Sequence, residues 1–234
     1  QSGIFSGRKI LEQVYTALGG GVEVFWSVKD GQAFEEDSVL AKVKGPVSTL
    51  LSGERVILNL LQHLTGIAST TQDLIQRLDD PDIKVVDTRK TLPGLRMIQK
   101  YAVRCGGGFN HRFRLNDGVM IKDNHIRAAG GIAKAVEMVR KQQGHMIKIE
   151  IEVETLNQVQ QAVDAEVDVI MLDNQTPDQV KKLRKYIPKS IIVELSGGIN
   201  PDNIAGYRKC GADIISVGWI THSVKACDIS FYID

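Results

Sequence analysis

The feature that most constrains the fold is an alternation of short apolar segments with amphipathic segments over residues 84–217. The strand-like apolar segments are Lys84–Asp87, Val119–Lys122, Ile147–Val153, Val167–Leu172, Ile191–Leu195 and Ile214–Val217. The helical segments are Leu95–Arg104, Gly131–Gln143, Leu156–Val163, Pro177–Tyr186 and Pro201–Lys209. Strands that alternate with helices of this length form βαβ units and a parallel sheet. The later units recur every ~20–25 residues, which is typical of a β/α barrel.

The chain ahead of this alternation has a different pattern. Val22–Val28 and Val39–Val43 alternate loosely between apolar and polar residues, with a turn at Asp30-Gly31, so this first part is interpreted as β. From about Ser48 the apolar residues recur at helical spacing toward Leu78, which predicts a long helix. We therefore predict a small portion over residues 1–48 and a barrel domain over residues 49–234.

The ends of the predicted strands carry polar residues or glycine. In a β/α barrel the carboxyl ends of the strands surround one mouth, where the chemistry is done. Polar residues at every strand end therefore predict a functional site there. The residues concerned are Asp87-Thr88-Arg89-Lys90, Lys122-Asp123, Glu152, Asp173-Asn174, Glu194 with Ser196-Gly197-Gly198, and Val217-Gly218-Trp219.

Cations form one group within this predicted site. The segment Lys84–Arg127 holds ten Lys or Arg against three Asp, a net charge of +7, whereas the whole chain carries +1. Such a local excess favours an anionic ligand, and arginine matches carboxylate and phosphate with two hydrogen bonds. A solvated basic face stays open as the alternative. Nucleic acid is not expected as a partner, because no recognised motif accompanies the charge. The candidate cations are Arg89, Lys90, His111, Arg112 and Lys122.

Carboxylates form the second group, at Glu152 and Asp173. In Ile147–Val153 alternate residues share a face, so Glu150 and Glu152 lie on the polar face of the strand. Carboxylates that face a basic pocket suit Mg²⁺, with substrate phosphates completing the coordination, or hydrogen bonds to ribose hydroxyls. Structural ion pairs remain the alternative, more so for Glu150 than for Glu152 and Asp173.

A phosphate site is predicted at Ser196-Gly197-Gly198, where a turn of small residues precedes the helix expected from Pro201. Backbone N–H groups and the helix dipole favour an anion at such a place. Val217-Gly218-Trp219 follows on the next strand, in the position of the late-strand phosphate site of many barrels.

The cysteines and the hydropathy bear on location. Cys105, Cys210 and Cys227 are odd in number and widely spaced, which predicts reduced thiols in a cytoplasmic protein. No apolar run approaches the ~20 residues of a membrane helix, and the first residues lack the pattern of a signal peptide. We expect no membrane partner.

Several stretches, in order along nearly the whole chain, carry a resemblance to one family. They are Gly53–Asn59, Asp87–Arg96, Gly106–Gly108 with His111-Arg112, Leu115–Asp117, Lys122–His125, Glu150–Glu154, Leu172–Asn174, Glu194–Ile199 and Gly218–Ser223. Together these stretches closely resemble the quinolinate phosphoribosyltransferase family. Members of that family usually carry a further N-terminal segment ahead of the residues that match Gly3 and Ile4.

The resemblance implies a fold and a reaction. The fold is α/β, an incomplete β/α barrel with a smaller N-terminal α/β open-faced sandwich, assembled as homodimers or multiples of dimers. The reaction joins quinolinate to 5-phosphoribosyl-1-pyrophosphate and gives nicotinate mononucleotide, pyrophosphate and CO₂, with Mg²⁺ as cofactor.

The resemblance also implies roles for individual residues. Arg55 is lent across the dimer interface to the neighbour's site. Lys90, Lys122, Glu152 and Asp173 are the expected catalytic residues, and Glu152 and Asp173 hold Mg²⁺ or ribose hydroxyls. Phosphate is held at Ser196, Gly197, Gly198 and Gly218, next to Val217 and Trp219. The residues around the pyridine dicarboxylate and the pyrophosphate are Thr88, Arg89, Lys90, His111, Arg112, Lys122 and His222.

Three other functions stay open at this point. A related phosphoribosyltransferase would use another pyridine or purine acceptor, and an acceptor with a single carboxylate would not need this many arginines. A barrel aldolase or isomerase would form a Schiff base at Lys90 or Lys122. A non-catalytic module for phosphoribosyl pyrophosphate or pyridine carboxylates would not need Glu152 and Asp173 opposite the cations.

Overall fold

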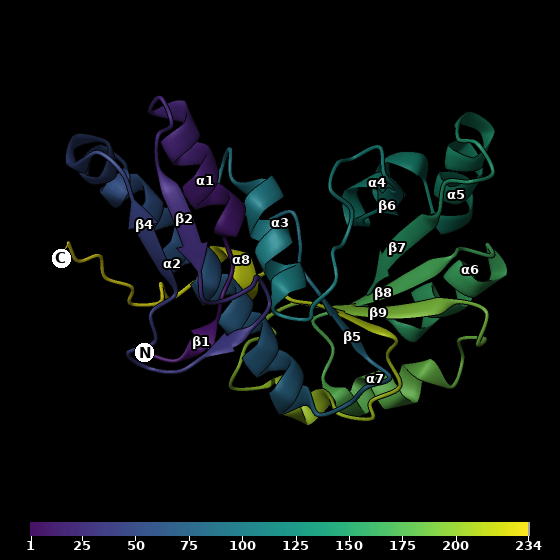
Figure 1. Ribbon diagram of the computed structural model, residues 1–234. Coiled ribbons are helices and arrows are strands. Elements are labelled where there is room, and N and C mark those ends of the chain that lie inside the picture. The colour runs from purple at the N-terminus through teal and green to yellow at the C-terminus, as the bar shows by residue number, and fades with distance from the viewer. Residues whose placement is uncertain (234) are drawn as a thin grey trace. The chain divides into compact units, whose positions relative to one another are not determined.

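The computed structural model describes residues 1–233 and separates into two compact units. The first unit comprises residues 1–75, 90–109 and the chain from Trp219 onward, and the second comprises residues 76–89 and 110–218 (Figure 1). The predicted division at residue 48 lies one residue into α2 (Val47–Leu78), a single helix of 32 residues. The division into domains at this residue stays a prediction.

Two antiparallel strands and two helices surround the core of the first unit. β2 (Glu23–Trp26) pairs with β4 (Ala41–Lys44), as the alternating pattern predicts. A second short pair joins β1 (Gly3–Ile4) to β3 (Ala33–Phe34). The buried residues come from α1 (Arg8–Ala17), from α2 and from the segments between strands, and apolar side chains of β2 and β4 pack against them. The buried core residues are Phe5, Leu11, Tyr15, Val28, Leu50, Ile57 and Leu61.

Helix α1 corrects the interpretation of the first part as β. Its apolar residues Leu11 and Tyr15 are one turn apart and buried, but the helix opens on Arg8 and Lys9, which the helix dipole disfavours there. No side chain at the N-cap position caps it. Instead, Oδ1 of Asp30 accepts hydrogen bonds from the backbone N–H groups of Gly7 and Arg8, at 2.7 Å and 3.2 Å. A cap that comes from a distant residue leaves no signal in the local sequence.

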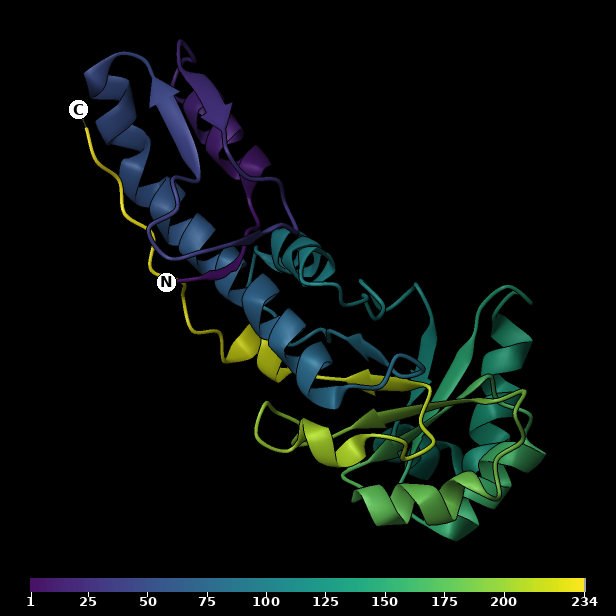
Figure 2. The same ribbon diagram turned by 60° about the horizontal axis from the view of Figure 1, so that its bottom comes forward.

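The chain over residues 223–233 lies along α2 within the first unit (Figure 2). The Gln62 carbonyl accepts a hydrogen bond from the backbone of Cys227 at 2.9 Å, and the Gln62 side chain donates one to the Ile229 carbonyl at 2.8 Å. Gly66 allows this approach, since a Cβ there would stand 2.3 Å from the Lys225 carbonyl oxygen. The unit also holds α3 (Arg96–Cys105) and α8 (Trp219–His222).

The second unit is built on one six-stranded parallel sheet, in the order β5-β10-β9-β8-β7-β6. All six strands lie where the apolar segments predict them, within two residues. Strands β5 and β6 form the two edges of the sheet among the described residues, which confirms the α/β class with an incomplete barrel. The strands are β5 (Lys84–Val86), β6 (Val119–Ile121), β7 (Ile149–Val153), β8 (Val169–Asp173), β9 (Ile192–Ser196) and β10 (Ile214–Ser216).

Helices follow the strands on the outside of this sheet (Figure 1). α6 (Leu156–Asp164) and α7 (Pro177–Arg184) begin at capping boxes, in which Thr155 and Thr176 accept from the backbone three residues on. α5 (Ile132–Gln142) also lies where it is predicted. α4 (Asp123–Ala129), whose first turn is capped by His125, is a helix that the pattern did not predict.

The predicted helix over Pro201–Lys209 is wrong. Only a short 3₁₀ helix, η1 (Ile204–Tyr207), forms there. The Asn200 side chain accepts from the Asp202 backbone at 2.9 Å, and the Asn203 side chain donates to the Gly198 carbonyl at 2.9 Å. Such side-chain bonds to the backbone compete with the helical ladder.

Among residues 1–233, no helix has both the length and the apolar composition that crossing a membrane requires.

Candidate active site

The strand register gathers polar side chains on one face of the sheet of the second unit. Residues paired across parallel strands point to the same side. Met171 is paired with Glu152 on one side and with Glu194 on the other, and Asp173 is paired with Ser196. The opposite face is apolar and buried beneath the helices, with Ile151, Leu172 and Leu195 at most 1% exposed. The polar face is therefore the side of the sheet that would form the packed interior of a complete barrel. The prediction that Glu150 and Glu152 share the polar face of their strand is confirmed.

A buried aspartate at the end of β5 anchors the loop that carries the cations. Asp87 is 0% exposed. Its Oδ1 accepts from the backbone N–H of His111 at 2.9 Å, and its Oδ2 accepts from the Asn110 side chain at 2.6 Å. The Arg112 guanidinium donates to the Gly118 carbonyl at 2.9 Å. These bonds fix the 110–112 segment beside the carboxyl end of the strand.

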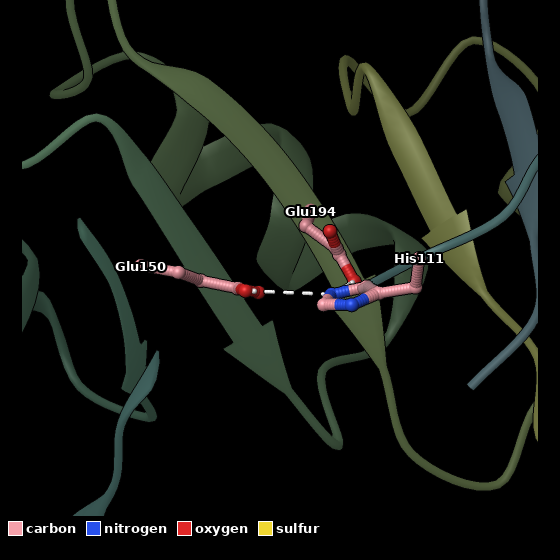
Figure 3. Close-up of side chains that lie close together, drawn as sticks. All are labelled: His111, Glu150 and Glu194. Carbon is pink, nitrogen blue, oxygen red and sulfur yellow. Dashed lines mark ion pairs between the residues drawn. The ribbon is translucent and has the colours of Figure 1, made fainter. Parts of the chain in front are cut away.

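His111 lies between two buried carboxylates, Glu150 of β7 and Glu194 of β9 (Figure 3). Its Nε2 is 3.3 Å from Oε2 of Glu150 and 3.2 Å from Oε1 of Glu194. The carboxylates are 8% and 3% exposed. Burial raises the pKa of Glu150, and the negative charge of Glu194 adds to that effect.

The same two carboxylates set the charge of His111. Burial alone would lower its pKa, but hydrogen bonds to Glu150 and Glu194 and their charges outweigh burial and raise the pKa to about 10. Its Nδ1 lies 2.7 Å from the backbone nitrogen of Arg112, an arrangement that suits the neutral ring. Charge-assisted hydrogen bonds are about twice as strong as neutral ones, so the two carboxylates favour the cationic form of His111 at neutral pH.

His111, Glu150 and Glu194 place three possible metal ligands within 4.8 Å of one another. A metal ion at Nε2 would have to displace a proton that both carboxylates stabilise. Metal-bound histidines donate their other ring N–H to an acceptor, whereas Nδ1 of His111 faces the N–H donor of Arg112. We therefore assign these carboxylates to holding His111 and not to holding a metal.

Arg112 and Arg89 add further positive charge at the same place. Burial lowers the pKa of Arg112, and repulsion from Arg89 lowers it further. Two guanidinium groups that repel each other are stabilised by an anion with two negative groups. Both arginines were predicted from the sequence, and the structure brings them together.

Lys122, the residue directly after β6, forms an ion pair with Glu152 of the neighbouring strand β7. The Glu152 side chain is 18% exposed and that of Lys122 is 46% exposed. Asp173, at the end of β8, accepts from the Asn174 side chain at 2.6 Å. Glu152 and Asp173 share the polar face and offer oxygen ligands, the type that Mg²⁺ prefers.

Ser196-Gly197-Gly198 forms a tight turn at the end of β9. Gly197 and Gly198 have φ angles of 97° and 62°, which favour glycine. A Cβ on Gly197 would stand 2.2 Å from the Asn174 side-chain oxygen. Because the helix expected after this turn is absent, a phosphate here would be bound by the turn and by the strand ends alone, without a helix dipole.

The remaining predicted residues divide between the units. Val217 of the second unit is buried, and its backbone N–H donates to the Val86 carbonyl at 2.9 Å. In the first unit, the His222 side chain lies 2.8 Å from the Ser223 hydroxyl, and the Trp219 ring meets the His222 ring edge to face at 6.5 Å. Thr88 and Gly218 are half-buried at the ends of β5 and β10.

Arg55 and Lys90, also of the first unit, carry exposed side chains. The Arg55 side chain is 72% exposed and lies 3.3 Å from Glu54. Lys90 stands in the irregular segment between β5 and α3, and its carbonyl oxygen accepts a hydrogen bond from the Thr221 hydroxyl at 2.8 Å.

The sequence placed Glu150 on the polar face and favoured a structural ion pair for it more than for Glu152 and Asp173, but it assigned no role to Asp87 and Glu194 at their strand ends. The signal was present, since a charged residue inside an otherwise apolar strand is rarely buried without a partner. The partner, His111, lies in a loop whose position the sequence does not define.

Comparison with known proteins agrees with this architecture. The family "Quinolinate phosphoribosyl transferase, N-terminal domain" matches residues 1–65, and "Quinolinate phosphoribosyl transferase, C-terminal domain" matches residues 67–232. The solved structure of NadC from Streptococcus pyogenes superposes with a TM-score of 0.95 at 40% identity, over 100% of this chain and 84% of that one. The nicotinate-nucleotide pyrophosphorylase from Francisella tularensis has a TM-score of 0.94 at 40% identity, over 98% and 82%.

Curated relatives agree as well. A probable nicotinate-nucleotide pyrophosphorylase (carboxylating) of Bacillus subtilis is 49% identical over 228 residues, which cover 97% of this chain and 79% of the relative. The nicotinate-nucleotide pyrophosphorylase (carboxylating) of Mycobacterium leprae is 39% identical over 224 residues, or 94% and 78%. With matches of this extent to both domains, the chain belongs to the quinolinate phosphoribosyltransferase family.

Proposed function

We propose that this chain transfers the phosphoribosyl group of 5-phosphoribosyl-1-pyrophosphate to quinolinate with loss of CO₂. The products are nicotinate mononucleotide and pyrophosphate, in the de novo synthesis of NAD. The observation that carries the proposal is the basic group of Arg89, His111 and Arg112 near the carboxyl ends of the strands, in which hydrogen bonds to Asp87 and Gly118 hold His111 and Arg112. A dianion with two carboxylates on one ring is the ligand that such a group favours.

Binding of quinolinate is assigned to these cations. Arg89 and Arg112 bind its carboxylates, and His111 presents a fixed positive edge because Glu150 and Glu194 hold its ring. Thr88 adds a hydroxyl at the end of β5. Positioning of the pyridine nitrogen against the ribose then supplies much of the rate enhancement.

Loss of pyrophosphate leaves positive charge at the anomeric carbon and places negative charge on the leaving group. Lys90 and Lys122 stabilise the leaving group, as preorganised charges do in many transferases. Glu152 and Asp173 bind the ribose hydroxyls or Mg²⁺, and that ion would neutralise the pyrophosphate charge when bound. Ser196, Gly197, Gly198 and Gly218 hold the 5′-phosphate through their backbone, next to Val217 and Trp219.

Attack by the ring nitrogen forms the bond to the ribose carbon and makes the pyridine ring cationic. The bond between C2 and its carboxylate then breaks, and its electron pair stays at C2, stabilised by the adjacent positive nitrogen. A proton replaces the CO₂ that leaves. No nucleophile of the protein is needed in this sequence.

A homodimer, or a multiple of dimers, is part of the proposal, with Arg55 reaching the neighbour's site together with His222 of that site. Leu51 and Val56 of α2, beside Arg55, are 50% and 52% exposed. Exposed apolar side chains around an exposed arginine suit an interface between two copies. A cytoplasmic location is also proposed, in keeping with the free thiols of Cys105, Cys210 and Cys227.

The test is formation of nicotinate mononucleotide from quinolinate, phosphoribosyl pyrophosphate and Mg²⁺, followed by chromatography. Nicotinic acid, with one carboxylate, is the comparison acceptor. We expect turnover of quinolinate only. Equal use of both acceptors, or of neither, would contradict the proposal.

A further inference from the structure

Two side chains of the first unit, Thr221 and Gln99, hold the backbone of the loop that carries Lys90, and a third, His63, contacts Gln99. The Thr221 hydroxyl donates to the Lys90 carbonyl oxygen at 2.8 Å. The Gln99 side-chain oxygen accepts from the Leu92 backbone N–H at 3.0 Å. These two contacts fix the peptide groups on both sides of Thr91. We call Thr221, Gln99 and His63 the Lys90 clamp.

His63 determines how the Gln99 amide is oriented. The Gln99 side-chain nitrogen lies 2.8 Å from Nε2 of His63 and 3.4 Å from the Thr221 carbonyl oxygen. A neutral imidazole accepts this hydrogen bond, and burial lowers the pKa of His63, which favours the neutral ring. With its nitrogen directed at His63, Gln99 must present its oxygen to Leu92.

Gln99 and Thr221 of the clamp are buried and His63 is half-buried, whereas the residue that they hold is exposed. Gln99 is 0% and Thr221 is 1% exposed, and polar groups at such depth are costly to leave unpaired. The Lys90 side chain is exposed, and residues 88–95 form neither helix nor strand. A loop without a backbone ladder keeps its position only through contacts of this kind.

We infer that Thr221 and Gln99 are positioning residues that fix the Lys90 backbone for catalysis, and that His63 orients the Gln99 amide. The inference rests on the proposed function, in which Lys90 stabilises the leaving pyrophosphate. Neither residue needs to touch a substrate. A displacement of a catalytic group by ~1 Å can cost about 100-fold in rate, so loss of one clamp bond is expected to lower kcat by about 10-fold or more and to leave KM for quinolinate nearly unchanged.

The test compares four forms of the whole protein: unmodified, Thr221→Val, Thr221→Ser and Thr71→Val. Valine keeps the shape of threonine and removes the hydroxyl, and serine keeps the hydroxyl. Thr71 is the matched control, because it is also 0% exposed and its hydroxyl also donates to a carbonyl, that of Ile67 at 2.8 Å. Two quantities are measured: the steady-state constants for quinolinate, and the rate at which trypsin cleaves the folded protein after Lys90, followed by mass spectrometry.

We expect Thr221→Val to lower kcat and to speed cleavage after Lys90, while Thr221→Ser and Thr71→Val resemble the unmodified protein. A Thr221→Val protein with normal kcat overturns the inference, even if cleavage is faster. Equal effects of Thr71→Val would show general destabilisation and overturn it as well. No turnover by the unmodified protein would contradict the proposed function instead, and the cleavage rates would then decide alone whether the clamp fixes the loop.

Discussion

The carboxylate of Asp87 fixes the backbone of His111, since its Oδ1 accepts the His111 N–H at 2.9 Å. This bond joins the end of β5 to the loop that carries His111 and Arg112. The two residues that it connects are far apart in the sequence. The loop's geometry therefore depends on a buried carboxylate that the proposed chemistry does not use directly.

Replacement of Asp87 by Asn is expected to lower both stability and turnover. An amide has one acceptor oxygen, so its NH₂ group must face either the His111 N–H or the Asn110 side chain. Loss of a buried hydrogen bond to a charged group costs about 1.5–3 kcal/mol, measurable by urea unfolding. Asp168→Asn is the control at the opposite ends of the strands, where the exposed Asp168 accepts the Ile149 N–H at 2.8 Å, a bond that an asparagine oxygen can keep. It should spare turnover; normal turnover of Asp87→Asn would contradict the assignment.

The raised pKa of His111 predicts a pH dependence of stability. Its folded pKa of about 10 lies above the ordinary value of 6.5, so its contribution is fully present below about pH 6.5 and is lost as the pH rises through 10. The difference in free energy of unfolding between the unmodified protein and His111→Gln should therefore shrink between pH 7 and pH 10. Urea unfolding at several pH values measures it. A difference that is constant or grows over this range would show that His111 is not held as a cation.

Arg112→Ala is expected to lower kcat/KM for quinolinate by about 10- to 100-fold, since a hydrogen bond to a charged group is worth about 1.5–3 kcal/mol. Arg114→Ala serves as the control. Arg114 lies two residues further along the same loop and is exposed. Initial rates at varied quinolinate measure both. Similar losses in the two variants would mean that only the overall charge of the loop matters.

Removal of Mg²⁺ by EDTA is expected to stop product formation, and added Mg²⁺ should restore it. Asp173→Asn should raise the Mg²⁺ concentration for half-maximal rate by about 10-fold or more, since metal sites are sensitive to each carboxylate. Asp178→Asn, an exposed aspartate in the first turn of α7, is the control. An unchanged Mg²⁺ requirement in Asp173→Asn would mean that Asp173 does not bind Mg²⁺ and binds only the ribose hydroxyls.

Asp30 connects three backbone and side-chain donors of the first unit, because it also accepts the Tyr101 hydroxyl at 2.7 Å. Asp30→Ala should lower the free energy of unfolding by about 2 kcal/mol, from loss of the α1 cap and of one hydrogen bond. Tyr101→Phe should lower it by about 1 kcal/mol. The double variant should lose less free energy of unfolding than the sum of the losses in the two single variants, because the two residues share a hydrogen bond. Full additivity, measured by urea unfolding, would mean that the two groups do not interact.

The spacing of apolar residues predicted the parallel sheet and the helices α2, α3, α5, α6 and α7. It could do so because each of these elements buries one face, and that burial sets the spacing. It missed α1, whose cap comes from Asp30, and it extended a helix over Pro201–Lys209, where Asn200 and Asn203 bond the backbone instead. Both errors share one cause. Side-chain contacts to the backbone decided the outcome, and apolar spacing does not record them.

The site was predictable in type and less so in arrangement. Strand ends identified Arg89, Lys122, Glu152 and Asp173, since parallel strands bring their carboxyl ends to one edge. The partners of His111 were not predictable, because Glu150 and Glu194 belong to strands separated by β8. Contacts across a sheet depend on curvature, which strand patterns do not contain.

The strand order has a consequence for how the protein is made. β5 is the first strand of the sheet in the chain, yet its partner is β10, so Lys84–Val86 pair with Ile214–Ser216. The other five strands can join their neighbours one after another as they leave the ribosome, whereas β5 must wait for nearly the whole chain. Pairing over such a separation is slow, because the loop must close before the contact is gained. The arginine that follows β5 therefore reaches its place last, and a nascent chain that stops before β10 carries the cations of the site without the frame that orders them.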